Sequence, residues 1–310
     1  MRHIRVISPP DRTDAVIDFL RDRPGVTHVT LARAGAIEPA GDLVGADVTR
    51  EAAHRVLRGL QELELPERGA ITVSTVDTAF SDAAVAAEEA VPGDPSDAVV
   101  WEELTARTRE ESTLNATFLA FLALAVLLAM VGVITNSPVT VVGAMVVGPE
   151  FGPLAAIAVA GATGHFRLAR RPLIALGIGF PVAMVLAWVV AEALLAADLY
   201  SRDVLTAADQ VDFIYQVGPF SLIVALLAGA AGMISLVTAK SAALVGVFIS
   251  VTTVPAAGYA VVAATVGEWQ RALESAGQLG INLLGIVVAG MLVLWLRPAA
   301  WRDLREVVGL

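Results

Sequence analysis

The sequence predicts an α-helical polytopic membrane protein with a small α+β domain at its N-terminus. The chain has 310 residues, is 56% hydrophobic and has a mean hydropathy of +0.70, far more apolar than an ordinary soluble domain. Its charges are unevenly spread, because residues 1–112 hold 21 acidic against 12 basic side chains and the remaining part holds 10 against 9. A polar, acidic front therefore precedes an apolar rear.

Residues 1–78 predict a cytoplasmic ferredoxin-like domain with the element order βαββαβ. Alternating and β-branched runs predict strands, and runs with helical periodicity, the first capped by Asp11, predict helices. His28 and His54 have no partner at metal-ligand spacing, and we interpret both as structural or surface residues. Because a fold alone does not define a function, a regulatory and an assembly role both stay open. The predicted strands lie at 2–7, 24–35, 42–49 and 70–76, and the helices at 11–21 and from 49 or 51.

Residues 79–112 predict a linker followed by an amphipathic helix. The stretch 80–98 is rich in Ala, Pro and acidic residues, and the helix at 99–112 would place Trp101 and Leu104 on one side. This face could lie on the membrane surface or pack against neighbouring subunits. Its acidic residues argue against the membrane surface, because anionic headgroups would repel them.

Residues 113–310 predict a transmembrane domain of six spans, each long enough to cross a bilayer as a helix. Arginines cluster after the second span and in the C-terminal tail, so the positive-inside rule predicts that both termini are cytoplasmic, in a bacterial inner membrane. Asp82 and Arg302 would then face the cytoplasm and Asp209 the outside. The N-terminus lacks an apolar signal-peptide core, so we expect no cleaved signal there. The predicted spans are about 114–134, 138–164, 172–197, 219–237, 242–265 and 278–296.

The six spans divide into two similar halves. A shift of 103 residues places the triplet 142–144 on the triplet 245–247 and Pro153 one residue from Pro255. Each half has three spans, so the second half must enter the membrane from the opposite side. This predicts two inverted three-helix repeats with interrupted helices, an arrangement of transporters whose sites lie at the repeat interface.

The second span contains a predicted break. Residues 137–164 would form a straight helix of about 42 Å, longer than the roughly 30 Å hydrocarbon core. A break at 148–153 resolves the excess, and a matching break is expected near 250–258. Freed backbone groups at such breaks must face protein or water. The candidate pore or substrate site comprises Gly148, Pro149, Glu150, Gly152, Pro153, Thr252, Thr253 and Pro255.

Glu150 is the chemically distinctive residue of this set. A carboxylate at the centre of a span costs at least about 2.5 kcal/mol unless it is neutral, paired or hydrated. One interpretation is a site that handles protons or cations; the other is a carboxylate that caps the N-terminus of a half-helix. Asn136 and Ser137 are expected to cap the helix that begins at Pro138, with a role at a pore mouth as the alternative.

The stretch from Asn136 to Pro153 resembles the DUF389 family of bacterial membrane proteins with an uncharacterised hydrophobic domain. In layout the similarity covers the chain from its first residue to about residue 300. The resemblance implies membrane location and this architecture, and it supplies no substrate. The matching positions are Asn136, Ser137, Pro138, Gly143, Ala144, Met145, Pro149, Gly152 and Pro153.

The leading functional prediction is a channel or carrier for ions or a small solute, with a cytoplasmic domain that gates or assembles it. The alternative is a non-conducting membrane sensor or scaffold. No enzyme is expected, since the chain has no cysteine and no HExxH, GxSxG or P-loop pattern. We also expect no cofactor, no metal ion and no nucleic acid partner. Small-residue helix faces predict a homo-oligomer in the lipid bilayer.

Overall fold

The computed structural model describes residues 1–76, 78–91, 104, 108, 112–206, 219–238 and 252–296. The chain divides into two compact units, Met1–Glu103 and Leu104–Leu310. Each unit is described by itself.

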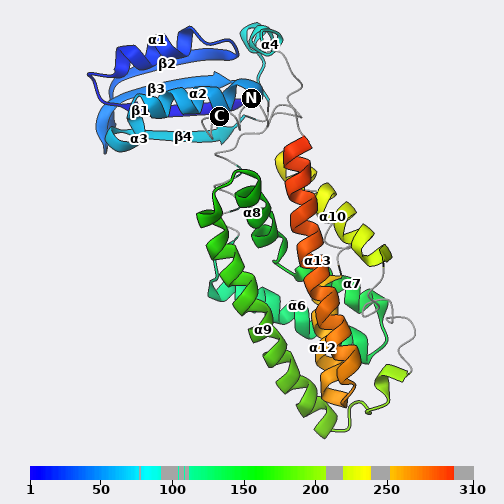
Figure 1. Cartoon of the computed structure of the whole chain (residues 1–310). Coiled ribbons are helices and arrows are strands. Elements are labelled where there is room, and N and C mark those ends of the chain that lie inside the picture. Colours follow the sequence, from blue (N-terminus) through cyan, green and yellow to red (C-terminus); the bar gives the residue numbers. More distant parts are fainter. Residues whose placement is uncertain are drawn as a thin grey trace. The chain divides into compact units, whose positions relative to one another are not determined.

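The N-terminal unit contains an antiparallel four-stranded sheet with the strand order β2-β3-β1-β4 (Figure 1). The predicted element order βαββαβ is observed, with the short helix α3 added before β4. Buried side chains of β1 and β3, such as Ile4 and Val44, pack against Val16 of α1 and Leu60 of α2 and form one core. The elements are β1 Arg2–Ser8, α1 Thr13–Arg21, β2 Val26–Ile37, β3 Ala40–Val48, α2 Arg50–Glu62, α3 Leu65–Arg68 and β4 Ala70–Thr75.

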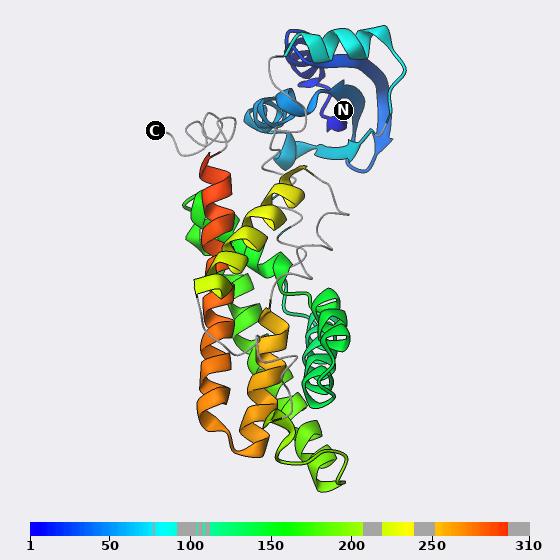
Figure 2. The ribbon, with the colours of Figure 1, turned by 90° about the vertical axis from the view of Figure 1, so that its right-hand side faces the viewer.

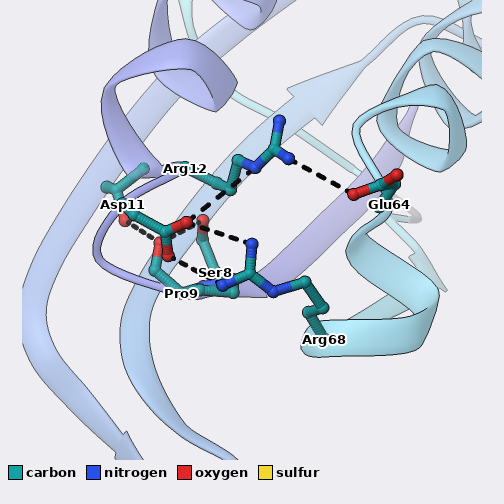
Figure 3. A network of polar contacts seen from close by, with 7 residues as sticks. Ser8, Pro9, Asp11, Arg12, Glu64 and Arg68 are labelled. Carbon is teal, nitrogen blue, oxygen red and sulfur yellow. Dashed lines mark hydrogen bonds and ion pairs between the residues drawn. The ribbon is translucent and has the colours of Figure 1, made fainter.

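An ion-pair network joins the turn after β1 to the corner between α2 and α3 (Figure 3). Arg68 donates to both carboxylate oxygens of Asp11 at 3.0 and 3.2 Å, and Arg12 donates to Glu64 at 3.2 Å. The Arg68 hydrogen bonds lower the pKa of the Asp11 carboxyl. The prediction that Asp11 caps the first helix is wrong, because α1 begins at Thr13 without a side-chain cap and Arg68 holds the Asp11 carboxylate.

The stretch predicted as a linker is partly helical. Helix α4, Asp82–Glu89, lies within it, because its alanines have a high helix propensity. Most of the predicted amphipathic helix lies outside the described residues; of its members described here, Leu104 and Thr108 are both helical and buried.

The second unit is a bundle of apolar helices. Four of its helices (α6, α9, α10 and α13) are long and apolar enough to cross a membrane; the pair α7–α8, bent by 55°, has the form of a broken span or of a re-entrant loop, and would be the fifth span in the first case. Six spans are not confirmed, because residues 242–251 of the predicted fifth span lie outside the described part. The helices are α6 Ala116–Ile134, α7 Pro138–Val147, α8 Phe151–Ala162, α9 Phe166–Ala196, the short 3-10 turn η1 Val204–Thr206, α10 Pro219–Thr238, α12 Thr253–Val266 and α13 Trp269–Leu296.

Two helices begin earlier than predicted. Helix α9 begins at Phe166 rather than at Pro172, and α13 begins at Trp269 rather than at Gln278. The predicted boundaries followed apolarity, but a helix can continue past the apolar segment with polar residues. Pro172 is accommodated inside α9, although proline removes one hydrogen-bond donor from the ladder.

The helix packing has a paired pattern. Helix α6 packs on α9 and α10 packs on α13, while α8 and α12 each contact both α9 and α13. Helices α9 and α13 run in opposite directions (Figures 1 and 2). Glycine allows the closest approaches: a Cβ at Gly258 of α12 would lie 2.7 Å from the Cβ of Ala129 in α6, and one at Gly229 of α10 would lie 2.7 Å from the Cα of Ile286 in α13.

Candidate functional site

The predicted break in the second span lies between α7 and α8, at Gly148, Pro149 and Glu150. Pro149 lacks the N–H that would continue the α7 ladder, so the helix ends before it. The break is shorter than the predicted 148–153. Pro153 lies in the first turn of α8, where backbone N–H groups have no partner within the helix. The N–H that proline lacks is therefore not missed there, and Pro153 is tolerated inside α8.

Glu150 lies at the N-terminus of α8, and the residue is only 6% exposed. Its Oε1 accepts a hydrogen bond of 2.6 Å from Oγ1 of Thr253, the first residue of α12. Its Oε2 is buried and has no hydrogen-bond partner among the described residues. Glu150 occupies the N-cap position of α8, but its side chain makes no cap bond to the first turn of the helix. The physical reason is its helical backbone (φ −72°, ψ −20°), since a capping residue has an extended one.

Gly148 makes room for this carboxylate. A Cβ at Gly148 would lie 2.3 Å from Oε2 of Glu150 and 2.8 Å from Cγ2 of Val254. The backbone of Gly148 is ordinary (φ −62°, ψ 129°), so glycine is needed here for space and not for a left-handed conformation.

A series of hydrogen-bonded polar side chains leads away from the break through α12, α13 and α10. Nδ2 of Asn282 donates to Oγ1 of Thr252 at 2.8 Å, and Nε2 of Gln278 donates to Oδ1 of Asn282 at 2.8 Å. The same Gln278 nitrogen contacts Oγ of Ser221 in α10. Because Thr252 precedes Thr253, these residues connect α10 to Glu150. We call this set the polar chain: Ser221, Gln278, Asn282, Thr252, Thr253 and Glu150.

The polar chain is deeply buried at its centre, whereas its members Ser221 and Thr252 are partly exposed. Gln278 and Asn282 are each 1% exposed and Thr253 is fully buried. Oε1 of Gln278 has no hydrogen-bond partner within the described ranges. Buried polar atoms are normally paired, so the two unpaired oxygens, on Gln278 and Glu150, are acceptors to which a ligand or water could bind.

Gln278 and Asn282, the two members of the polar chain in α13, were not predicted as site residues from the sequence. Ser275, Gln278 and Asn282 follow a spacing of three and four residues, which places them on one helix face. A stripe of polar residues with helical spacing inside an apolar span indicates a polar helix face, so these residues could have been predicted from the sequence. Ser275 donates to the carbonyl of Ala256 at 2.8 Å and ties α13 to α12 beside the site.

The remaining predicted site residues have local roles. Oγ of Ser137 accepts a hydrogen bond from the Thr140 amide and caps α7 at 3.3 Å. Asn136 precedes this cap in a left-handed conformation, with φ 48°. Pro153 and Pro255 occupy the third position of α8 and of α12, and both are buried together with Gly152.

The chemistry of the site is that of oxygen ligands. It offers carboxylate, hydroxyl and amide oxygens, together with carbonyls at the C-terminal end of α7 that have no partner within that helix, and such ligands suit hard cations. Within the described ranges no group of three or more His, Asp and Glu side chains could hold a metal ion.

The site lies within the part of the chain that matches a known family. Residues 145–288 match the model of DUF389, a domain of unknown function. The chain carries a DUF389 domain. The matched range begins in α7 and ends in α13, so the DUF389 domain includes the break and the whole polar chain and excludes the N-terminal unit. No curated protein and no solved structure matches the chain.

Proposed function

We propose that the DUF389 domain is a transport domain that conducts or carries a small cation or a proton, with Glu150 as its central side chain. The observation that carries the proposal is the buried Oε2 of Glu150 at the break between α7 and α8, which has no hydrogen-bond partner among the described residues. Ionisable groups inside membrane spans are expensive, and they mark ion pathways and proton relays.

The surroundings of Glu150 support a cation rather than an anion. The break holds a carboxylate and carbonyl oxygens at the C-terminal end of α7, which attract cations, while the N-termini of α8 and α12 bring positive dipole ends that favour an ionised Glu150. In transporters with interrupted helices, unwound carbonyls and half-helix C-termini coordinate Na⁺ or protons. No Lys or Arg side chain is among the hydrogen-bond partners of Glu150 in the described part of the chain.

An inverted repeat, with the site between its halves, is part of the proposal. The equivalent pairs α6–α9 and α10–α13 both pack together, and α9 and α13 run in opposite directions (Figures 1 and 2). The hydrogen bond from Thr253 to Glu150 spans 103 residues, the same shift that aligned the two halves of the sequence. The pore or binding site would thus lie where the two half-helix N-termini of α8 and α12 meet.

Flux measurements test this proposal. Purified protein in liposomes would be assayed with Na⁺, K⁺ and proton gradients, with and without a membrane potential. The proposal expects cation or proton flux above that of empty liposomes. Silence across this panel would overturn it and favour the alternative, a non-conducting sensor or scaffold.

The proposal includes a cyclic homo-oligomer with cytoplasmic termini, in which the N-terminal unit regulates or assembles the transport domain. The chain has no native cysteine, so single cysteines at Asp82, Asp209 and Arg302 would report sidedness cleanly. Labelling of position 302 from outside would refute the orientation, and a strictly monomeric mass in mild detergent would refute the oligomer.

A further inference from the structure

The N-terminal unit contains a cluster of Ser81, His28, Asp47 and His3 that the transport proposal does not use. Nε2 of His28 lies 2.8 Å from Oγ of Ser81, and Nδ1 of His28 lies 2.8 Å from Oδ2 of Asp47. Nδ1 of His3 lies 2.7 Å from the other carboxylate oxygen, Oδ1. Hydroxyl, imidazole and carboxylate thus follow one another in the order of a nucleophile, its base and the group that orients the base.

The hydrogen bonds define the tautomer of His28. An ionised carboxylate only accepts hydrogen bonds, so Nδ1 must carry the proton that is donated to Asp47. In the neutral ring Nε2 is then unprotonated and accepts from the Ser81 hydroxyl. This is the tautomer in which an imidazole removes a proton from a serine. The Asp47 carboxyl is ionised near neutral pH: burial raises its pKa, but the hydrogen bonds from His28 and His3 outweigh burial, and the net pKa lies below its ordinary value.

The backbone is distorted where it aims this ring. His28 has φ 50°, an uncommon left-handed conformation. The register between β2 and β3 shifts between Thr27 and Thr30, which places a β-bulge at His28. Bulges re-aim side chains and are frequent next to active sites, and backbone strain of this kind gathers at functional positions.

Ser81 stands at the N-terminus of α4. Serine in this position normally accepts a hydrogen bond from the first turn, but its hydroxyl makes no cap bond here and contacts His28. The amides of Ala84 and Val85 donate to the Ser81 carbonyl at 3.1 and 3.2 Å. The preceding first-turn amides, of Asp82 and Ala83, are left without such a bond by the helix geometry, and in acyl-transfer enzymes such amides beside a nucleophile hold an oxyanion.

We propose that Ser81 is an activated nucleophile and that the N-terminal unit hydrolyses esters of small carboxylic acids. The His28 side chain is 35% exposed and that of Asp47 16%, so a small ester can reach the cluster from solvent. This proposal is independent of the transport function.

The chemical step is balanced without any further reagent. Oγ of Ser81 attacks the ester carbonyl carbon while Nε2 of His28 takes the hydroxyl proton. The alcohol leaves with that proton, and the acyl group remains on Ser81. A water molecule then attacks the acyl carbon, passes one proton through His28 back to Oγ and releases the acid, so that ester and water yield acid and alcohol.

The test uses the full-length protein in detergent. A fluorophosphonate probe, followed by peptide mass spectrometry, should label Ser81, and p-nitrophenyl acetate should be hydrolysed. Ser81→Ala should abolish the labelling at this peptide. His28→Asn removes the base while keeping a residue type that tolerates positive φ, and it should slow labelling and hydrolysis about 10²-fold or more, within the range for general bases.

Two controls separate chemistry from folding. Ser74→Ala removes an exposed serine of β4 and should change neither readout. Thermal melting should show that His28→Asn is folded. The proposal is overturned if Ser81 is labelled no faster than Ser74, or if folded His28→Asn reacts at the rate of the unmodified protein.

Discussion

Oγ1 of Thr253 donates a 2.6 Å hydrogen bond to Oε1 of Glu150, and the two residues lie 103 positions apart in the chain. The bond brings the N-terminus of α12 against the break between α7 and α8. It satisfies one carboxylate oxygen and leaves Oε2 without a hydrogen-bond partner among the described residues. Glu150 is thereby held in one orientation, with one oxygen available for a ligand.

Glu150→Gln is expected to alter transport without altering assembly. The amide keeps the size of the side chain and can still accept from Thr253 through its oxygen, but it removes the charge and the titratable proton. Flux, ion preference or pH response in liposomes should therefore change, while the elution profile in detergent should not. Identical flux at every pH tested would show that Glu150 is structural.

Thr253→Val is expected to destabilise the second unit by about 1–3 kcal/mol, the range for a buried acceptor that loses its donor. The substitution keeps the shape of the side chain and leaves both Glu150 oxygens unpaired. Thr253→Ser restores the hydroxyl and should recover most of the loss. Thermal melting in detergent would measure both variants; equal melting temperatures for Val and Ser would contradict the importance of the bond.

Gly148→Ala is expected to displace the Glu150 carboxylate, because the new Cβ would lie 2.3 Å from Oε2. Loss of stability and altered flux should follow together. Gly143→Ala in α7 is the matched control, since a Cβ there meets no atom within 4 Å. Comparable effects of the two substitutions would mean that the helix α7, and not the carboxylate, is responsible.

Asn282→Leu is expected to interrupt the polar chain at its middle. It removes the donor to Thr252 and one of the two acceptors of Gln278, which keeps its contact with Ser221, and stability should fall by about 1–3 kcal/mol. If the polar chain forms part of the path, flux should fall as well. Gln270→Leu is the control on the same helix, because Gln270 is exposed and its hydrogen bond is to the nearby Glu274, away from the polar chain. Unchanged flux in folded Asn282→Leu would place the path elsewhere.

The N-terminal unit is expected to lose stability in acid through Asp47. Burial raises the pKa of this carboxyl, but the hydrogen bonds from His28 and His3 lower it more, and the net shift is downward. A carboxyl with a lowered folded pKa stabilises the fold above its unfolded pKa of about 3.9 and loses that stabilisation as the pH falls through the folded value. Hydrogen exchange of β3 peptides, corrected for intrinsic rates, should show weaker protection below about pH 4. Asp47→Asn should remove this contribution and flatten the response.

The sequence by itself determined the division into a polar α+β front and an apolar helical rear. It also located the broken helix around Gly148 to Pro153 and singled out Glu150 as the carboxylate inside it. These features are local: an apolar run of span length, a Pro/Gly interruption and a carboxylate inside it have the same meaning in any fold. The polar stripe of Ser275, Gln278 and Asn282 was equally local, and it could have been found by its helical spacing.

Only the tertiary structure decided which groups meet. The sequence placed Glu150 near the second break but could not choose between Thr252 and Thr253, whose hydroxyls lead to different partners. From the sequence we interpreted His28 as a structural or surface residue, because Ser81 and Asp47 lie 53 and 19 residues away along the chain. Hydrogen bonds between such distant side chains depend on how helices cross and how strands are registered, and one bulge in β2 re-aims a ring in a way that no local pattern records.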